Sequence, residues 1–116
     1  MARAKSPSAR KHRKIKSEAR GFKHARRKRV KNAKEALLHA GQYAYIGRKL
    51  RKRDIKKLWI MRLNAAARQN GLTYNSLIDG LKKAKIEINR KHLSQIAISD
   101  AKAFKQILKT AGFKIS

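Results

Sequence analysis

The stretch RKLRKRDIKK, residues 48–57, constrains the fold of this chain more than any other segment. Seven of its ten side chains are Lys or Arg, and Asp54 is its only acid. On a helical wheel at about 100° per residue the cations cover an arc of about 240°, which leaves no wide apolar stripe. Like charges four residues apart also cost an isolated helix about 0.2 to 0.5 kcal/mol per pair. The segment is therefore unsuited to burial in a core and is destabilised unless opposing charge comes from outside the chain.

Two interpretations of this charged segment compete. A solvated helix face is the usual reason for a run of charges, but such faces intersperse acids with bases. The whole chain has 33 Lys and Arg against 6 Asp and Glu, a formal net charge of +27 over 116 residues. Repulsion on that scale disfavours a compact chain in isolation, and nucleic acid is the polyanion that such chains usually bind. We therefore expect the segment to lie between phosphate backbones. Contacts between cations and phosphates position a protein on a nucleic acid without reading its base sequence.

Composition and spacing exclude several classes of protein. The chain has no cysteine, which excludes disulfides and thiolate metal sites. It has no apolar run near the roughly 20 residues of a membrane span, and its start lacks the apolar core of a secretory signal. The histidines, at positions 12, 24, 39 and 92, lack the spacing of a helical metal pair. Because no P-loop, dinucleotide fingerprint or nucleophile elbow appears either, we expect no enzyme activity, cofactor, metal, membrane partner or small-molecule substrate.

The two halves of the chain differ in charge and in apolar content. Residues 1–57 hold 22 bases and 3 acids, a net charge of +19, and residues 58–116 hold 11 and 3, a net charge of +8. Large apolar side chains number 11 in the first half and 20 in the second. The sequence predicts a basic extension over residues 1–57 and a globular domain over residues 58–116, a size at which many domains fold alone.

The second half is punctuated as helices. Gly71 is predicted to close a first helix in the left-handed conformation, and Thr73 to cap a second one that carries Leu77, Ile78 and Leu81 on one face. The segment KIEI, residues 85–88, alternates like a strand but has no partner strand, and is interpreted as an extended linker.

Two further helices follow this linker in the prediction. Asn89 is predicted to cap the first of them, and Ser99 or Asp100 the second. The last helix is expected to end at Gly112. Its buried stripe is expected to consist of Phe104, Ile107, Leu108 and Ala111.

The first half is also helical in propensity. Pro7 suits a helix start, Gly21 is the first breaker after it, and no proline intervenes between residues 25 and 70. Gly41 and Gly47 predict a bend. A narrow seam of mostly small residues runs along this helix, formed by Val30, Ala33, Leu37, Ala40 and Ala44. The predicted fold is all-α: a long, bent, basic N-terminal helical extension followed by a small globular helical domain.

Acids and rings in the extension have their own interpretations. Glu18 and Glu35 each follow a Lys by four residues, the spacing of surface ion pairs, and are interpreted as structural. Phe22 either stacks on an exposed base or packs against its neighbours. The same two interpretations apply to Tyr43 and Tyr45. Trp59, between Leu58 and Ile60, is predicted to lie in the core.

Three stretches resemble one family: the basic start, AGQYAY (residues 40–45) and RKRDIKKLWIMRLNAAARQNGLTYNSLIDGLKKAKIEINRK (residues 51–91). They are similar to bacterial ribosomal large-subunit protein twenty over nearly the whole chain. The matching positions are Leu58, Trp59, Ile60, Arg62, Asn64, Ala65, Ala66, Arg68, Gly71, Tyr74, Ile78, Gly80, Leu81, Ala84, Ile86, Arg90 and Lys91.

The resemblance implies a structural constituent of the ribosome, located in the cytoplasm. It implies an extension threaded into large-subunit ribosomal RNA and a domain at an RNA helix junction. It further implies an early role in subunit assembly, repression of the protein's own mRNA, and contacts with neighbouring ribosomal proteins.

The expected RNA contacts combine the cations and flat rings of the extension with the start of a helix in the domain. They are Arg3, Lys5, Arg10, Lys11, His12, Arg13, Lys14, Arg20, Phe22, Lys23, His24, Arg26, Arg27, Arg29, Arg48, Lys49, Arg51, Lys52, Arg53, Lys56, Arg90, Lys91 and His92.

Two rival functions compete with RNA binding. A helix-turn-helix-like DNA-binding protein would place Arg90, Lys91, His92 and Gln95 at base edges, but a basic arm of 57 residues fits that class poorly. A membrane-active cationic peptide would need a broad apolar face, which the extension lacks.

Overall fold

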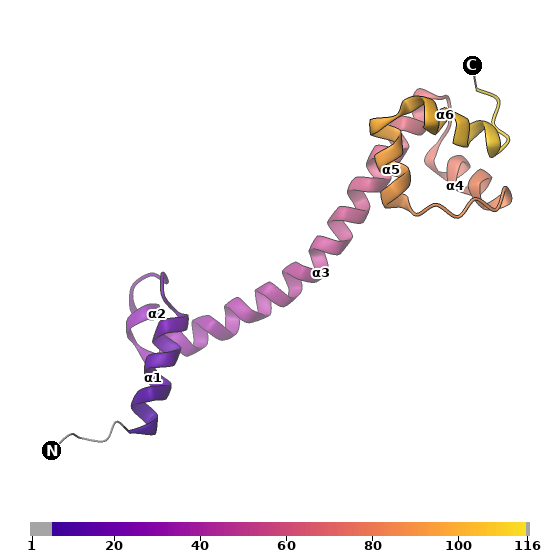
Figure 1. Cartoon of the computed structure of the whole chain (residues 1–116). Coiled ribbons are helices and arrows are strands. Elements are labelled where there is room, and N and C mark those ends of the chain that lie inside the picture. The colour runs from indigo at the N-terminus through magenta and orange to yellow at the C-terminus, as the bar shows by residue number, and fades with distance from the viewer. Residues whose placement is uncertain (1–5, 116) are drawn as a thin grey trace. The chain divides into compact units, whose positions relative to one another are not determined.

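The computed structural model describes residues 6–115, and all regular secondary structure in that part is helical (Figure 1). The six helices are α1 Pro7–Glu18, α2 Ala25–Lys28, α3 Val30–Gln69, α4 Tyr74–Lys83, α5 Arg90–Ser99 and α6 Ala101–Thr110. The prediction of an all-α chain with a long basic helix and a small helical C-terminal part is confirmed. The chain forms two compact units, Met1–Lys49 and Leu50–Ser116, and α3 contributes residues to both. The functional boundary predicted after residue 57 stays a prediction.

The first unit begins with the helix start that the sequence indicates. The Ser6 hydroxyl oxygen accepts a hydrogen bond from the Ala9 N–H at 3.2 Å, and Pro7 occupies the first turn of α1. Gly21, with φ +89°, ends the turn that follows α1. Proline has no backbone N–H, but in the first turn of a helix no hydrogen bond is lost, because an N–H there would have no helical partner.

The helix predicted from about residue 25 is interrupted, so that part of the prediction is wrong. After the four residues of α2, Arg29 is extended with φ −95° and ψ 128°, and α3 starts at Val30. Packing explains the break, because residues 21–26 lie against the first turns of α3 and Ala19 and Ala33 are fully buried. A straight helix from residue 25 would carry the preceding turn away from this contact, so tertiary packing overrides helix propensity here.

Farther along, α3 is helical without interruption through Gly41 and Gly47. The bend expected at these glycines stays a prediction. The small-residue seam is covered only at its start: Ala33 is buried, whereas Ala40 and Ala44 are exposed.

The second unit contains the hydrophobic core. Its helices α4, α5 and α6 gather around the end of α3 (Figure 1). The buried cluster consists of Leu63, Ala66, Ala67, Leu77, Leu81, Leu93, Phe104 and Leu108. The three- and four-residue spacing of these positions within α3, α4 and α6 is what places them on one face of each helix. The core stripe predicted for α6 is confirmed, and so are Leu77 and Leu81 of the stripe predicted for α4, whereas Ile78 is half-buried and outside the buried cluster.

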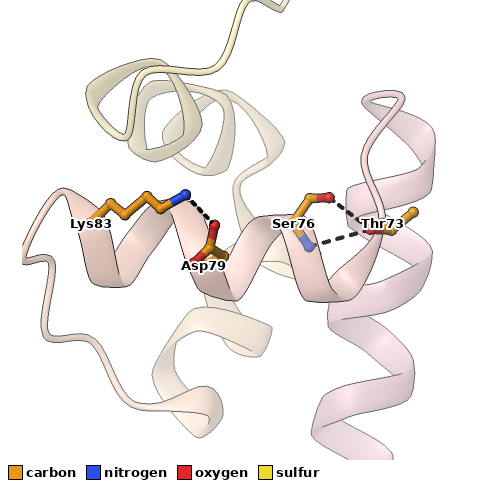
Figure 2. A network of polar contacts seen from close by, with 4 residues as sticks. All are labelled: Thr73, Ser76, Asp79 and Lys83. Carbon is orange, nitrogen blue, oxygen red and sulfur yellow. Dashed lines mark hydrogen bonds and ion pairs between the residues drawn. The ribbon is translucent and has the colours of Figure 1, made fainter.

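Side chains at the helix ends hold the short helices of this unit. Figure 2 shows the Thr73 hydroxyl oxygen accepting from the Ser76 N–H at 3.3 Å, and the two hydroxyls share a hydrogen bond of 2.9 Å. The Asn89 carboxamide oxygen accepts from the His92 N–H at 2.9 Å. For the last helix the cap is Asp100, which accepts from two N–H groups at 3.1 Å. Each cap satisfies donors that a helix start leaves unpaired, and such a cap typically contributes about 1 kcal/mol.

Turns close the helices as the sequence indicates. Gly71 has φ +77° and Gly112 has φ +92°, the left-handed region in which a side chain is unfavourable. After α4 the same position is taken by Lys85, with φ +55°. The linker that follows has no strand, and its Ile86 and Ile88 pack against the core.

We predict that Gly80→Ala destabilises the second unit by about 1 to 3 kcal/mol, the usual cost of overpacking. A Cβ atom at this position of α4 would overlap the ring of Phe113. Urea unfolding followed by circular dichroism measures the change. In a Phe113→Ala background the same substitution should cost nothing, because Ala then has space and favours a helix. An equal loss in both backgrounds would show that Phe113 is not the cause.

Candidate nucleic-acid interface

No other segment among residues 6–115 covers the middle of α3. Every residue in the range 38–58 is exposed. The range contains six of the predicted RNA-binding cations: Arg48, Lys49, Arg51, Lys52, Arg53 and Lys56. It also exposes seven large apolar side chains: Leu38, Tyr43, Tyr45, Ile46, Leu50, Ile55 and Leu58. A helix that presents both cations and apolar groups to solvent over this length is expected to be covered by a partner.

Almost all Lys and Arg side chains of the described residues, 6–115, lack a carboxylate partner within that range. Within residues 6–115 there is one ion pair, in which Lys83 Nζ lies 2.7 Å from Asp79 Oδ2 on the exposed face of α4 (Figure 2). The hydrogen bond to Asp79 and the charge of that carboxylate raise the pKa of Lys83 above its ordinary value. The remaining Lys and Arg side chains in this part of the chain stay available to anions from outside.

The ion pairs predicted for Glu18 and Glu35 do not form among the described residues, so that interpretation is wrong. The physical reason is that an exposed pair gains little Coulomb energy in water and loses side-chain entropy. Spacing of four residues permits such a pair but does not enforce it.

The predicted contacts of the N-terminal part lie on α1, on the turn after it and on α2. Arg3 and Lys5 lie outside the described residues. The exposed members are Arg10, Lys11, His12, Arg13, Lys14, Arg20, Lys23, His24, Arg26, Arg27 and Arg29. Phe22 is half-buried, so its ring is only partly available to a base. On α3, Lys49 places its ammonium 4.5 Å from the centre of the Tyr45 ring, a cation–π contact.

A cavity of about 770 Å³ lies in the first unit, between the turn after α1 and one face of α3. Its lining from the turn includes Phe22, Lys23 and Arg26, which the sequence had singled out. Its lining from α3 includes Asn32, Glu35, His39 and Tyr43, which the prediction of RNA contacts omitted. These four recur at three or four residues and therefore share a helix face, a signal that was present in the sequence.

A second, smaller cavity of about 270 Å³ lies in the second unit. It is lined by Lys56 and Trp59 from α3 and by Asn89, Arg90 and Lys91 at the start of α5. The predicted contacts Arg90 and Lys91 are thus brought next to an aromatic ring. His92 is exposed on the same helix but does not line the cavity.

Two details of this cavity differ from expectation. Trp59 is half-buried and outside the buried cluster, so its assignment to the core is wrong. Trp59 lies one helical turn before Leu63. At that turn of α3 the start of α5 is close to the Trp59 side chain, but α4 and α6 do not enclose it. Arg90 is half-buried, and its Nε–H donates to the Tyr74 hydroxyl at 2.8 Å, which fixes the direction of the guanidinium.

Two other kinds of site are not formed by the described part of the chain. Within residues 6–115 no three His, Asp or Glu side chains are grouped as a metal site would need. No helix in that range combines the length and the apolar character needed to cross a bilayer.

Comparison with known families agrees with this geometry. The family described as Ribosomal protein L20 matches residues 2–107. The chain belongs to the ribosomal protein L20 family. Relatives named large ribosomal subunit protein bL20 extend the match: that of Clostridium novyi is 50% identical over 96% of this chain and 95% of its own length. That of Caldanaerobacter subterraneus is 52% identical over the same shares, and that of Alkaliphilus oremlandii 48% over 100% and 99%.

Membership of the L20 family confirms the resemblance that the sequence motifs indicated. It is a family of structural proteins of the ribosome, so the expectation that the chain is not an enzyme agrees with it. The alternatives of a DNA-binding protein and of a membrane-active peptide are set aside.

We predict that Trp59→Ala separates stability from binding. The substitution should reduce the free energy of unfolding by less than Leu63→Ala, because loss of a fully buried Leu side chain costs about 2 to 5 kcal/mol. It should weaken binding to a large-subunit ribosomal RNA fragment by about 1 to 3 kcal/mol if the ring stacks on a base. Urea unfolding and a filter-binding titration give the two quantities. Unchanged affinity would assign Trp59 to packing alone.

Proposed function

We propose that this protein is a structural constituent of the large ribosomal subunit that binds large-subunit ribosomal RNA directly. Its relatives carry the name of a large-subunit protein and match it over nearly their full lengths. Two surfaces would make the contacts. One is the extension surface, formed by α1, the following turn, α2 and residues 38–58 of α3. The other is the domain surface, formed by Lys56, Trp59, Arg90 and Lys91.

The observation that carries the proposal is the continuous exposure of residues 38–58 together with their charge. Cations there point in most directions around the helix, and within the described residues they have no carboxylate partner. A flat binding surface would satisfy only one side of such a helix. RNA that surrounds the helix places phosphates on several sides and stacks bases on its exposed tyrosines.

A helix enclosed by RNA has a consequence for the order of assembly. It cannot enter after the RNA has folded tightly around it, because one end of the chain, with the compact unit that it carries, would have to pass through the closed structure. The extension would therefore bind while the surrounding RNA is still open. This supports an early role in assembly of the large subunit.

The domain surface suits recognition of RNA shape. Its aromatic ring and its cations lie beside a compact core, at fixed spacing, and Arg90 is held by Tyr74. Such a surface can distinguish a junction of RNA helices from a plain duplex, which offers few exposed bases. We further propose that the protein's own mRNA is bound through the same surface, which would repress its translation.

Neighbouring ribosomal proteins are the remaining proposed partners. Met61 on α3 and Ile98 on α5 belong to the second unit and are 62% and 63% exposed. Large apolar side chains with this exposure suit contact with another folded protein better than contact with phosphates.

We predict that charge on the extension controls the salt dependence of RNA binding. Replacing Lys49, Arg51, Lys52 and Arg53 together by Gln should flatten the plot of log affinity against log salt by about 0.7 to 0.9 for each phosphate that is no longer neutralised. The matched control replaces Lys82, Lys102, Lys105 and Lys109 by Gln, which changes the net charge equally on exposed positions of the second unit. Equal slopes for both quadruple variants would contradict direct binding of phosphates by the extension.

We also predict that RNA stabilises the exposed part of α3. In the free protein, amide hydrogens of residues 38–58 should exchange faster than those of α4 and α6, because like-charge repulsion is concentrated there and no core covers it. Binding of a ribosomal RNA fragment should slow this exchange. Hydrogen exchange measured by mass spectrometry reports both states, and strong protection of residues 38–58 at low salt without RNA would contradict the prediction.

A further inference from the structure

We propose that the cavity of the first unit binds the base of one unpaired guanosine of the RNA, an inference that rests on the proposed function. The cavity, defined by its lining of residues 21–26 and the α3 face from Asn32 to Tyr43, has a volume of about 770 Å³. That volume falls in the range of small-molecule sites, which is about 300 to 1,000 Å³. Recognition of a base would add to the contacts of surface cations with phosphates, which read no base.

Flat rings supply the stacking part of such a site. Phe22 comes from the turn and Tyr43 from α3, and both line the cavity. Tyr43 is 72% exposed, so no other part of the described chain uses its ring for packing. Aromatic side chains that bind unpaired bases by stacking have this combination of a fixed backbone and a free face.

Cations near the rings supply contacts for the sugar–phosphate backbone. Lys23 and Arg26 line the same cavity, and both are exposed. A base that enters the cavity keeps its flanking phosphates outside, within reach of such long side chains.

Glu35 identifies the base. It is one of only 6 acids in the chain, it lines the cavity, and within residues 6–115 its carboxylate forms no ion pair or side-chain hydrogen bond. A carboxylate at a phosphate-binding surface weakens binding unless it accepts hydrogen bonds from the ligand, since phosphates repel it. A nucleobase with donors on its edge would meet that condition.

Guanine is the base that can donate a hydrogen bond to each of the two oxygens of a carboxylate. Its N1–H and N2–H₂ groups are adjacent donors, so the two oxygens of Glu35 can accept two parallel hydrogen bonds. Adenine and cytosine place a ring-nitrogen acceptor beside the amino group, and uracil has one N–H between two carbonyls; each of these would set an acceptor against the carboxylate. Asn32, with both a donor and acceptors, lines the cavity beside it and can serve the remaining edge.

The test uses the full-length protein and five-nucleotide RNAs of sequence UUNUU, with N as G, A, C or U. Single-stranded probes avoid the cost of extruding a base from a duplex, and about 200 mM salt weakens contacts to the few phosphates. Fluorescence anisotropy should show that UUGUU binds about 5- to 150-fold more tightly than the other three, as a bidentate base contact gives. Equal affinities for all four would overturn the proposal.

Two pairs of variants locate the effect. Glu35→Gln should reduce the preference for UUGUU, while Glu18→Gln, which changes the charge equally on exposed α1, should keep it. Tyr43→Ala should reduce the preference for UUGUU over UUAUU, while Tyr45→Ala, a change of another exposed tyrosine of α3 that does not line the cavity, should lower any affinity for the two probes equally and keep the preference. A guanine preference that survives both Glu35→Gln and Tyr43→Ala would place the guanine elsewhere and overturn the assignment.

Failure of this inference can be told from failure of the proposed function. If the protein binds ribosomal RNA with strong salt dependence but shows no preference among the four probes, only the guanosine site is withdrawn. If it binds no RNA, the proposed function fails first. Free GMP is a further probe, and binding of GMP as tight as that of UUGUU would assign the cavity to a free nucleotide instead of an RNA strand.

Discussion

Unpaired positive charge is the constraint on which the rest of this structure depends. With 33 bases and 6 acids, the chain cannot neutralise itself, and an ammonium or guanidinium group is too costly to bury without a partner. Its charges must therefore stay at the surface, and the apolar groups that remain must build a core in a limited stretch of chain. The cluster around Leu63, Leu77 and Phe104 is that core, and it recruits only the end of α3 with three helices of ten residues.

The small core gives the second unit a rigidity that the exposed part of α3 lacks. Caps at Thr73, Asn89 and Asp100 fix where each short helix starts, and apolar stripes fix how the helices face one another. This fixed packing brings Trp59 next to Arg90 and Lys91, which are distant in sequence. By contrast, residues 38–58 are all exposed and, within residues 6–115, have no buried core packed against them. The division suits a protein in which one part recognises a folded shape and another is enclosed by its partner.

The first unit contains a contact that charge alone would oppose. The turn with Phe22, Lys23 and Arg26 folds onto α3, and Ala19 and Ala33 are the only fully buried side chains among residues 6–49. His24 adopts φ +55° in this turn, a conformation that costs a non-glycine residue free energy. With so little burial in so basic a segment, the proposed RNA would supply much of the stabilisation. The carboxylate of Glu35 in this cavity is consistent with recognition of a base as well as of phosphates.

The sequence by itself determined the all-α class, the separation of charge from core, and the helix starts at Thr73 and Asn89, and it narrowed the last helix start to Ser99 or Asp100, because periodicity, composition and capping are local properties. Its motifs also determined the family. Only the tertiary structure decided the break at Arg29, the partial exposure of Trp59 and the two cavities. Each of these depends on which segments meet in space. A helical wheel places Glu35 and Tyr43 on one face, but it cannot show that the turn after α1 folds back to complete a cavity with them.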